Sequence, residues 1–197
     1  ESGVMMDLGN WVNEEACRAA SLWPDGIAVA INISAKQLIF PALPNTVNES
    51  IRRHRLQPNR LELEVTESLF MGDSANALDV LKRLRALGVG IALDDFGTGY
   101  SSLGYLNKAV FHKLKIDGSF VREAKDNRET VAIIQSIVQL AKSFRMTVTA
   151  EGVETADEFT RMRDLGCHQI QGYLFGRPMD FERASELVHG VQQRLSA

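Results

Sequence analysis

The chain has 197 residues, of which 45% are hydrophobic and 24% are charged, a composition typical of a soluble globular protein. Its formal net charge of −3 provides no basic surface for duplex nucleic acid, so a nucleic-acid-binding function is disfavoured. The most apolar stretches, such as residues 26–33 and 131–140, are too short to cross a bilayer, and the first residues lack the pattern of a signal peptide. Cys17 and Cys167 have no metal-type spacing, which indicates buried thiols. We therefore expect a cytoplasmic domain without direct membrane contact.

Short β-branched runs alternate with longer amphipathic stretches from end to end, and no linker or repeat divides the chain. In chain order the pattern predicts a helix at residues 6–23, a strand at 27–33, a short helical segment near 45–53, a strand at 60–65, a helix at 74–87, a strand at 90–93, a turn at 101–106, a strand at 113–116, a helix at 128–144, a strand at 147–150, a helix at 156–165, a strand at 168–174 and a helix at 181–195. This alternation predicts one α/β domain over residues 1–197, with a parallel sheet and helices outside it.

Two α/β architectures fit this alternation, an open doubly wound sheet and a TIM-like (β/α) barrel. An open sheet that binds a dinucleotide usually begins with a glycine-rich turn, and the sequence has none. A closed barrel needs eight strands and about 250 residues, more than this sequence supplies. A barrel would therefore lack its first two strands in this chain.

Polar side chains stand at the C-terminal end of every predicted strand, which is the end where barrel enzymes build their active sites. In chain order they are Asn32, Glu64, the adjacent Asp94 and Asp95, Lys115 with Asp117, Glu151 and Gln171. Carboxylates gathered in this way repel one another unless a cation neutralises them. Oxygen ligands without His or Cys favour Mg²⁺ or Mn²⁺ over zinc, and two adjacent aspartates suit a site for two ions.

Each of these residues also has a purely structural interpretation. A single acidic residue after a strand usually caps a helix or lies on the surface, but one after nearly every strand is harder to explain in this way. Lys115 is either an inward lysine neutralised by a neighbouring carboxylate or a catalytic ammonium, and we favour the second. The turn at residues 96–102 is either a tight loop or a mobile flap that holds Asp95 over the site. His112 and His168 precede strands, so they are not expected to bind metal.

Six segments together resemble the EAL domain family of bacterial cyclic di-GMP phosphodiesterases. They are residues 32–35 (NISA), 64–68 (EVTES), 94–103 (DDFGTGYSSL), 115–117 (KID), 150–155 (AEGVET) and 171–175 (QGYLF). The match runs in order through essentially the whole chain. It implies a TIM-like barrel of the EAL type that hydrolyses cyclic di-GMP to linear pGpG with Mg²⁺ or Mn²⁺, and two ions are expected.

The resemblance also implies roles for individual residues of this chain. The implied metal ligands are Asn32, Glu64, Asp94, Asp95 and Glu151. Lys115 is implied to orient or activate the attacking water, with Glu151 supporting it as a base. The implied substrate contacts are Asp117, Glu154 and Gln171. Glu67 is implied to anchor the flap that follows Asp95.

The main departure from the family is that the Glu-Ala-Leu motif which names it is absent from this chain. We therefore interpret the chain as the C-terminal three-quarters of the domain, without its first two strands and one metal ligand, and expect these 197 residues alone to be weakly active or inactive. An unpaired sheet edge calls for a partner, so we also expect a homodimer. A parent protein with an upstream sensory or GGDEF-type domain, or with a membrane anchor, is compatible with the resemblance.

Two other functions fit parts of the pattern. A non-catalytic cyclic di-GMP receptor would bind the dinucleotide and signal by a change of shape, but receptors of this type commonly lose the ligands and the lysine that this chain retains. An unrelated metal-dependent barrel hydrolase would keep the carboxylates but not the motif at residues 94–103. The phosphodiesterase is therefore the main hypothesis, and the receptor is the alternative.

Overall fold

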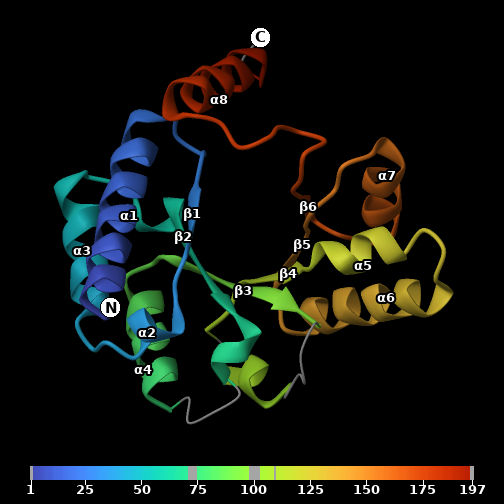
Figure 1. Cartoon of the computed structure of the whole chain (residues 1–197), viewed down its shortest axis with the longest axis horizontal. Coiled ribbons are helices and arrows are strands. Elements are labelled where there is room, and N and C mark those ends of the chain that lie inside the picture. Colours follow the sequence, from blue (N-terminus) through green and yellow to red (C-terminus); the bar gives the residue numbers. More distant parts are fainter. Residues whose placement is uncertain (1, 71–74, 98–102, 109, 196–197) are drawn as a thin grey trace. The chain divides into compact units, whose positions relative to one another are not determined.

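The computed structural model describes residues 2–70, 75–97, 103–108 and 110–195 (Figure 1). The chain divides into two compact units. The first comprises Glu1–Glu64, Ser74–Gly90 and Pro178–Ala197, and the second comprises Val65–Asp73 and Ile91–Arg177. Each unit has strands of its own and helices that pack on them. None of the helices in the described ranges is long and apolar enough to span a membrane.

The first unit is mainly helical. Its helices are α1 (Ser2–Leu22), α2 (Ala35–Leu38), α3 (Leu43–Arg53), α4 (Ala75–Ala86) and α8 (Phe181–Leu195), with a 3-10 turn at Pro58–Arg60. Its strands are β1 (Val29–Asn32) and β2 (Leu61–Thr66), whose last two residues fall in the second unit. β1 and β2 are parallel, α1 packs against α3 and β1, and α3 packs against α4 (Figure 1). The short helix α2, which was not predicted, begins at a capping box of Ser34 and Gln37.

A buried arginine fixes the end of α1. Arg60 is 7% exposed, and its guanidinium donates hydrogen bonds of 2.6 to 3.1 Å to four backbone carbonyl oxygens. These acceptors belong to Ala20, Trp23, Pro24 and Ile27. Because the last carbonyls of a helix have no partner inside the helix, a buried cation at this place satisfies them. The connection from α1 to β1 is therefore held by Arg60.

The helix α8 docks on the end of α1 through aromatic contacts. Trp23 stacks on Phe181 with ring centroids 6.2 Å apart, and its Nε1–H donates to Ser185 Oγ at 2.9 Å. The Arg18 guanidinium lies 4.8 Å from the centroid of the Phe181 ring. These contacts attach the last helix of the chain to the first one within the same unit.

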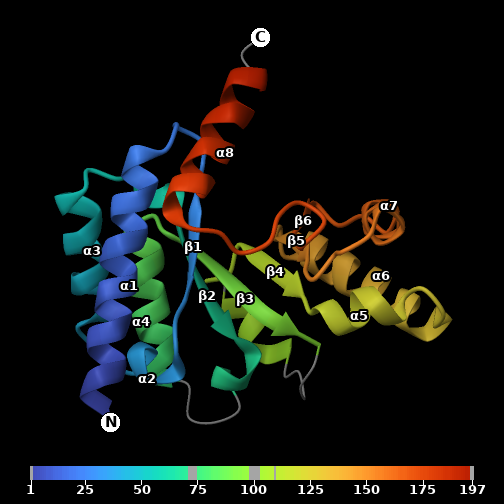
Figure 2. The same cartoon turned by 45° about the horizontal axis from the view of Figure 1, so that its top comes forward.

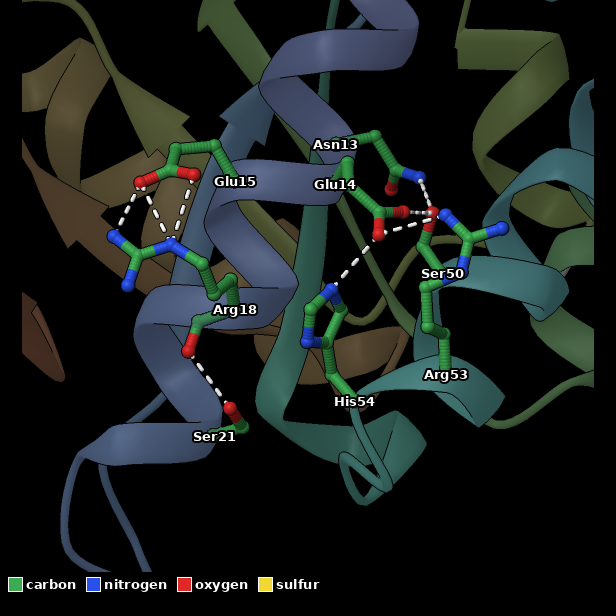
Figure 3. A network of polar contacts seen from close by, with 8 residues as sticks. All are labelled: Asn13, Glu14, Glu15, Arg18, Ser21, Ser50, Arg53 and His54. Carbon is green, nitrogen blue, oxygen red and sulfur yellow. Dashed lines mark hydrogen bonds and ion pairs between the residues drawn. The ribbon is translucent and has the colours of Figure 1, made fainter.

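A polar network joins α1 to α3 (Figure 3). Asn13 Nδ2 donates to Ser50 Oγ at 2.8 Å, and the Ser50 hydroxyl donates to Glu14 at 2.7 Å. Glu14 also accepts a hydrogen bond from Arg53 Nη1 and contacts His54 Nε2, each at 2.9 Å. Burial by itself would raise the pKa of Glu14, but its three hydrogen-bond partners lower that pKa to about 2. Glu14 is therefore a fully ionised and well-paired carboxylate at neutral pH.

The second unit contains a parallel sheet covered by helices. Its strands are β3 (Gly90–Phe96), β4 (Lys113–Ile116), β5 (Thr147–Ala150) and β6 (Gln169–Ile170). Its helices are α5 (Gly118–Glu123), α6 (Arg128–Ser143) and α7 (Ala156–Asp164), with 3-10 segments at Glu67–Phe70 and Leu103–Lys108. β3 to β6 are successive parallel neighbours, and α6 packs against β4 and β5 (Figure 2). Leu114, Ile116 and Val148 of these strands are completely buried.

Side-chain caps determine where the helices of the second unit begin. The Asn127 side chain accepts hydrogen bonds from the N–H groups of Glu129 and Thr130 at the start of α6. Thr155 and Glu158 form a capping box at the start of α7. The two predicted helix starts are therefore confirmed, whereas the short helix α5 was not predicted.

The last predicted strand, residues 168–174, is wrong in length because β6 ends at Ile170. The Val153 N–H donates to the Gln171 carbonyl, and the Phe175 N–H donates to the Gly172 carbonyl, so a turn follows β6. A methyl group placed on Gly172 would lie 2.1 Å from the carbonyl oxygen of Val153. Only glycine allows this approach of two backbones, so the strand pattern is interrupted there.

Both cysteines are free thiols in the interior, as predicted. Cys17 lies in α1 and Cys167 lies just before β6. Burial is the main cause that raises the pKa of each thiol to about 11. Both thiols are therefore protonated and unreactive at neutral pH.

Candidate metal centre and active site

Three neighbouring strands of the second unit bring charged side chains to one edge of the sheet. Asp94 and Asp95 lie near the end of β3, Lys115 lies in β4, and Glu151 directly follows β5. The three strands are parallel, and Lys115 is paired with Thr149 in the register of β4 and β5. The carboxyl ends of parallel strands meet at one edge, which is where α/β proteins bind their ligands. The four charged side chains therefore converge.

Lys115 lies between carboxylates from the two strands beside its own. Its Nζ is 3.2 Å from Asp94 Oδ1 and 2.6 Å from Glu151 Oε1. Lys115 is only 3% exposed, so its ammonium is held in the interior by these two ion pairs. The ion pairs match the interpretation of Lys115 as an inward lysine neutralised by neighbouring carboxylates, and its catalytic role stays a prediction.

Asp94, Asp95 and Glu151 form the one group of potential metal ligands found among the described residues. One oxygen from each of the three lies within 4.8 Å of the others. These three carboxylates outnumber the Lys115 ammonium, so the cluster keeps an excess of negative charge. Carboxylate oxygens are the ligands that Mg²⁺, Mn²⁺ and Ca²⁺ prefer, and the donors therefore fit a hard divalent cation.

The pKa of Asp95 reflects this excess of negative charge. Burial raises it first, and the negative charges of Asp94 and Asp117 raise it further. The positive charge of Lys115 acts in the opposite direction but does not cancel these effects. Ionised Asp95 is therefore disfavoured by its surroundings, and a bound cation would relieve the repulsion.

The backbone of Asp95 explains how two consecutive aspartates reach one site. Side chains of consecutive residues in a regular strand point to opposite faces. The register of β3 against β4 shifts between Leu93 and Phe96, and Asp95 has a φ of 53°, in the left-handed region that non-glycine residues rarely adopt. Its N–H donates to Asp94 Oδ1 at 3.0 Å. The bulge therefore turns both carboxylates toward Glu151, at the cost of local strain.

Glu67 contacts the segment that follows Asp95. Its carboxylate accepts a hydrogen bond of 3.2 Å from the Gly97 N–H, and Glu67 is 4% exposed. Gly97 has a φ of 97°, which favours glycine. The rest of the predicted flap, residues 98–102, lies outside the described residues, so the anchoring role of Glu67 stays a prediction.

Asp117 has a structural role at the start of α5, besides its predicted role in substrate binding. It is the N-cap of α5, and its carboxylate accepts hydrogen bonds from the Ser119 N–H at 2.9 Å and from the Ser119 hydroxyl. These bonds are the main cause that lowers the pKa of Asp117, and the positive charge of Arg122 contributes. The predicted contact of Asp117 with substrate is not tested by this geometry.

The other two predicted substrate contacts also lie near the ends of β5 and β6. Glu154 is exposed, and its N–H donates to the Glu158 carboxylate at 2.8 Å. Gln171 is exposed and follows β6 directly. Both side chains are therefore accessible to a ligand, and their predicted role stays a prediction.

Asn32 and Glu64 belong to the first unit. They are partners in the parallel register of β1 and β2, and the Ile33 N–H donates to the Glu64 carbonyl at 2.8 Å. Glu64 is 7% exposed, whereas Asn32 is exposed. The two predicted ligands thus lie side by side at the ends of adjacent strands, and their metal ligation stays a prediction.

The sequence analysis did not predict a close contact between two glycines at the site. A methyl group on Gly152 would lie 3.2 Å from the Gly118 Cα, and one on Gly118 would lie 3.4 Å from the Glu151 carbonyl oxygen. Gly152 has a φ of 65°. The signal present in the sequence is that each glycine follows an acidic strand-end residue, Asp117 or Glu151. The contact brings the backbone beyond β4 close to the backbone beyond β5.

Comparison with protein families gives one match that covers most of the chain. The family model described as "EAL domain" matches residues 1–178. The chain is 43% identical over 187 residues to MucR of Pseudomonas aeruginosa, a bifunctional diguanylate cyclase/cyclic di-GMP phosphodiesterase, and 37% identical over 195 residues to NbdA of the same organism, a cyclic di-GMP phosphodiesterase. These alignments cover 93% and 97% of this chain but only 27% and 25% of the relatives. The chain thus spans about a quarter of the length of these relatives.

Solved structures with the same fold include two complexes with cyclic di-GMP. The phosphodiesterase of PaMucR in complex with c-di-GMP aligns with a TM-score of 0.87 at 43% identity, covering 92% of this chain and 75% of that one. BlrP1 of Klebsiella pneumoniae in complex with manganese and cy-diGMP aligns with a TM-score of 0.76 at 33% identity, covering 86% of this chain and 45% of that one. The prediction of an α/β, TIM-like barrel fold of the EAL type is therefore confirmed.

Proposed function

This chain belongs to the EAL domain family, and from that premise we propose that it hydrolyses cyclic di-GMP to linear pGpG with the help of divalent metal ions. The observation that carries the proposal is the cluster of Asp94, Asp95 and Glu151 around Lys115. The family resemblance supplies the substrate, and the cluster supplies groups that suit phosphodiester hydrolysis. Relatives that share the fold are named as cyclic di-GMP phosphodiesterases.

The proposed reaction is a displacement at one phosphorus atom. A water oxygen attacks the phosphorus, the bond from phosphorus to the ribose 3′ oxygen breaks, and the product keeps a 5′-phosphate. Glu151 accepts one proton of the attacking water, and the leaving 3′ oxygen takes up a proton from solvent water. Lys115, which is ion-paired with Glu151 at 2.6 Å, keeps its positive charge beside this proton transfer and orients the water. Divalent cations held by Asp94, Asp95 and Glu151 would supply positive charge for the phosphate oxygens and would make the attacking water more acidic.

We propose that two ions, Mg²⁺ or Mn²⁺, bind the carboxylates of this site. Asp94, Asp95 and Glu151 would hold them, and Asn32 and Glu64 are the further proposed ligands. Manganese and calcium are each named in complexes of the related BlrP1 with cy-diGMP, which supports a hard divalent cation. Asp117, Glu154 and Gln171 are the proposed substrate contacts, and Glu67 is the proposed anchor of the segment after Asp95.

The proposal is tested by chromatography of the products that the full-length protein forms from cyclic di-GMP. We expect pGpG only when Mg²⁺ or Mn²⁺ is present. Asp94→Ala removes a ligand, so we expect its residual rate to rise steeply as the metal concentration increases, because metal affinity has fallen. No pGpG at any concentration of Mg²⁺ or Mn²⁺ would contradict the proposal.

The alternative function is a receptor that binds cyclic di-GMP without cleaving it. Calorimetry separates the two, because a receptor would bind the dinucleotide in Mg²⁺ and leave it intact. The retained lysine and carboxylates favour the enzyme, since binding alone does not need an ammonium buried between two carboxylates. Binding without product after prolonged incubation would establish the receptor instead.

We also propose that the full-length protein is a cytoplasmic signalling protein that acts as a homodimer. MucR is named as bifunctional and is much longer than this chain, so an upstream sensory or GGDEF-type domain fits the relatives. Sedimentation velocity of the full-length protein measures its oligomeric state directly. A single species with the mass of a monomer at micromolar concentration would contradict the dimer.

A further inference from the structure

We propose that Arg122 contacts a phosphate of the bound dinucleotide and thereby sets the affinity of the site for its substrate, an inference that rests on the proposed function. No motif singled out in the sequence includes this residue. The inference comes from where the short helix α5 begins and from the direction in which its side chains lean.

The first step is the position of α5. Asp117 follows β4 directly and caps the helix, and Gly118 is its first residue. The start of α5 therefore lies at the carboxyl end of β4, the strand that carries Lys115. Arg122 comes four residues after Gly118, which is one turn, and long side chains in helices lean toward the helix N-terminus. The Arg122 side chain is thus directed back toward the strand ends.

The second step is the place that the guanidinium reaches. A methyl group on Gly118 would lie 3.0 Å from Arg122 Nη1, and one on Gly152 would lie 3.6 Å from the same nitrogen. Gly118 and Gly152 follow the strand-end residues Asp117 and Glu151 in the sequence. The guanidinium therefore occupies space that two missing side chains leave beside the ends of β4 and β5.

The third step compares the two cations at this edge. The Lys115 ammonium is buried and forms ion pairs with Asp94 and Glu151. Arg122 is exposed, and its charge acts on Asp117 from a distance. Within the part of the chain that the structure describes, Arg122 makes no ion pair and no side-chain hydrogen bond. Arg122 is therefore accessible to an external anion, unlike Lys115.

The fourth step is the chemistry of the ligand. A guanidinium presents parallel N–H donors that match two oxygens of a phosphate group, and it stays charged at every relevant pH. The acidic cluster beside Arg122 repels a dianionic dinucleotide. The positive charge of Arg122 at the edge of this cluster therefore favours binding of the substrate. A phosphate is thus the group of cyclic di-GMP that Arg122 is suited to hold.

The test compares KM and kcat for cyclic di-GMP in the full-length protein with Arg122→Gln and Arg122→Lys. We expect Arg122→Gln to raise KM about tenfold or more, the scale of a hydrogen bond to a charged group, with kcat close to that of the parent. Arg122→Lys should recover part of the affinity, because it restores the charge but not the paired donors. The rise of KM with salt should be shallower in Arg122→Gln, which a contact to an uncharged base edge would not produce.

Two further variants control the experiment. Arg128→Gln removes an exposed arginine from the start of α6 and should leave KM unchanged. Gly118→Ala keeps every charge but places a methyl group 3.0 Å from Arg122 Nη1, so it should displace the flexible guanidinium and raise KM by a smaller factor. Calorimetry with Ca²⁺, under conditions in which no product forms, should show the same order of dissociation constants.

The outcomes separate this inference from the proposed function. Equal KM values for the parent and Arg122→Gln would overturn the role of Arg122 and leave the phosphodiesterase intact. A lower melting temperature and a lower kcat in both Arg122 variants, without rescue by lysine, would show that Arg122 only supports Asp117 and α5, and would overturn the inference too. A parent protein that neither binds nor cleaves cyclic di-GMP would overturn the proposed function itself.

Discussion

Each unit of the molecule contains a partly buried carboxylate within a polar cluster, and the two clusters shift pKa values in opposite directions. Around Glu14 in the first unit the neighbours donate hydrogen bonds, and its pKa falls to about 2 (Figure 3). Around Asp95 in the second unit, burial and further carboxylates raise the pKa. The first cluster is complete within the protein, whereas the second has more negative charge than its own lysine balances. The difference marks the second cluster as a site for a cation and the first as part of the scaffold.

The largest effect should come from removing the cation of the second cluster with Lys115→Ala. We expect kcat for cyclic di-GMP to fall by roughly 10²-fold or more, the scale of removing a positioned proton-transfer or electrostatic group, while dinucleotide and metal still bind. Without metal the variant should also be less stable by about 3 kcal/mol, because Asp94 and Glu151 lose their buried partner. Single-turnover assays measure the chemical step, and calorimetry measures binding.

Added Mg²⁺ should restore much of the stability of Lys115→Ala, since a divalent cation replaces the lost positive charge. Lys142→Ala, which removes an exposed lysine at the end of α6, serves as the matched control and should change neither quantity. If Lys115→Ala cleaves at the parental rate, the water is activated without Lys115 and its proposed role is wrong.

A smaller effect, on stability alone, should follow from Glu14→Gln in the first unit. The substitution removes the charge that Ser50, Arg53 and His54 pair with, so we expect a loss of about 1 to 2 kcal/mol at pH 7 with kcat unchanged. Glu15→Gln is the matched control, because Glu15 is the next residue and its ion pair is with the partly exposed Arg18 on the same helix, so it should change stability little. Urea unfolding at a series of pH values measures these differences.

The pH dependence has a definite sign. The pKa of Glu14 is lower in the folded protein, about 2, than its ordinary value of 4.5. Its contribution to stability is therefore fully present above pH 4.5 and is lost as the pH falls toward 2. The parent and Glu14→Gln should accordingly approach each other in stability at acid pH. A difference that stays constant from pH 7 to pH 3 would show that the network does not depend on the charge of Glu14.

The sequence predicted the parts of the site that follow from strand ends and not the parts that depend on local backbone geometry. Asp94, Lys115 and Glu151 converge because parallel strands end at one edge, a rule that needs only the strand positions. The approach of Asp95 to the same cluster contradicts simple alternation along β3 and requires a bulge with a positive φ, which no residue pattern signals. The position of the Arg122 guanidinium was not predicted either, because it depends on two glycines that follow different strands.

The same division applies to the fold. Most helices were predicted within a few residues, because their apolar residues recur at helical spacing, as at Ile134, Ile137 and Val138 of α6. The end of β6 was not, because the close approach of Gly172 to Val153 joins segments that meet only in three dimensions. The Glu14 network was not predicted for the same reason, since its partners lie 36 to 40 residues away along the chain.

The smallest expected change in stability comes from Asp95→Asn. It tests the comparison between the two clusters most directly, because its sign is opposite to that of Glu14→Gln. Asp95→Asn removes one of the crowded negative charges, and asparagine tolerates the positive φ of this position. We expect the metal-free protein to gain roughly 0.5 to 1 kcal/mol, discounted for partial solvent exposure, while its affinity for Mn²⁺ falls.

Asp117→Asn is the matched control in the same unit, and it should lose stability because hydrogen bonds to Ser119 favour the ionised Asp117 carboxylate. Thermal unfolding in EDTA measures the stability of both metal-free variants. A loss of stability in Asp95→Asn would mean that the charge of Asp95 is already balanced within the protein, and the contrast with Glu14 would no longer identify the metal centre.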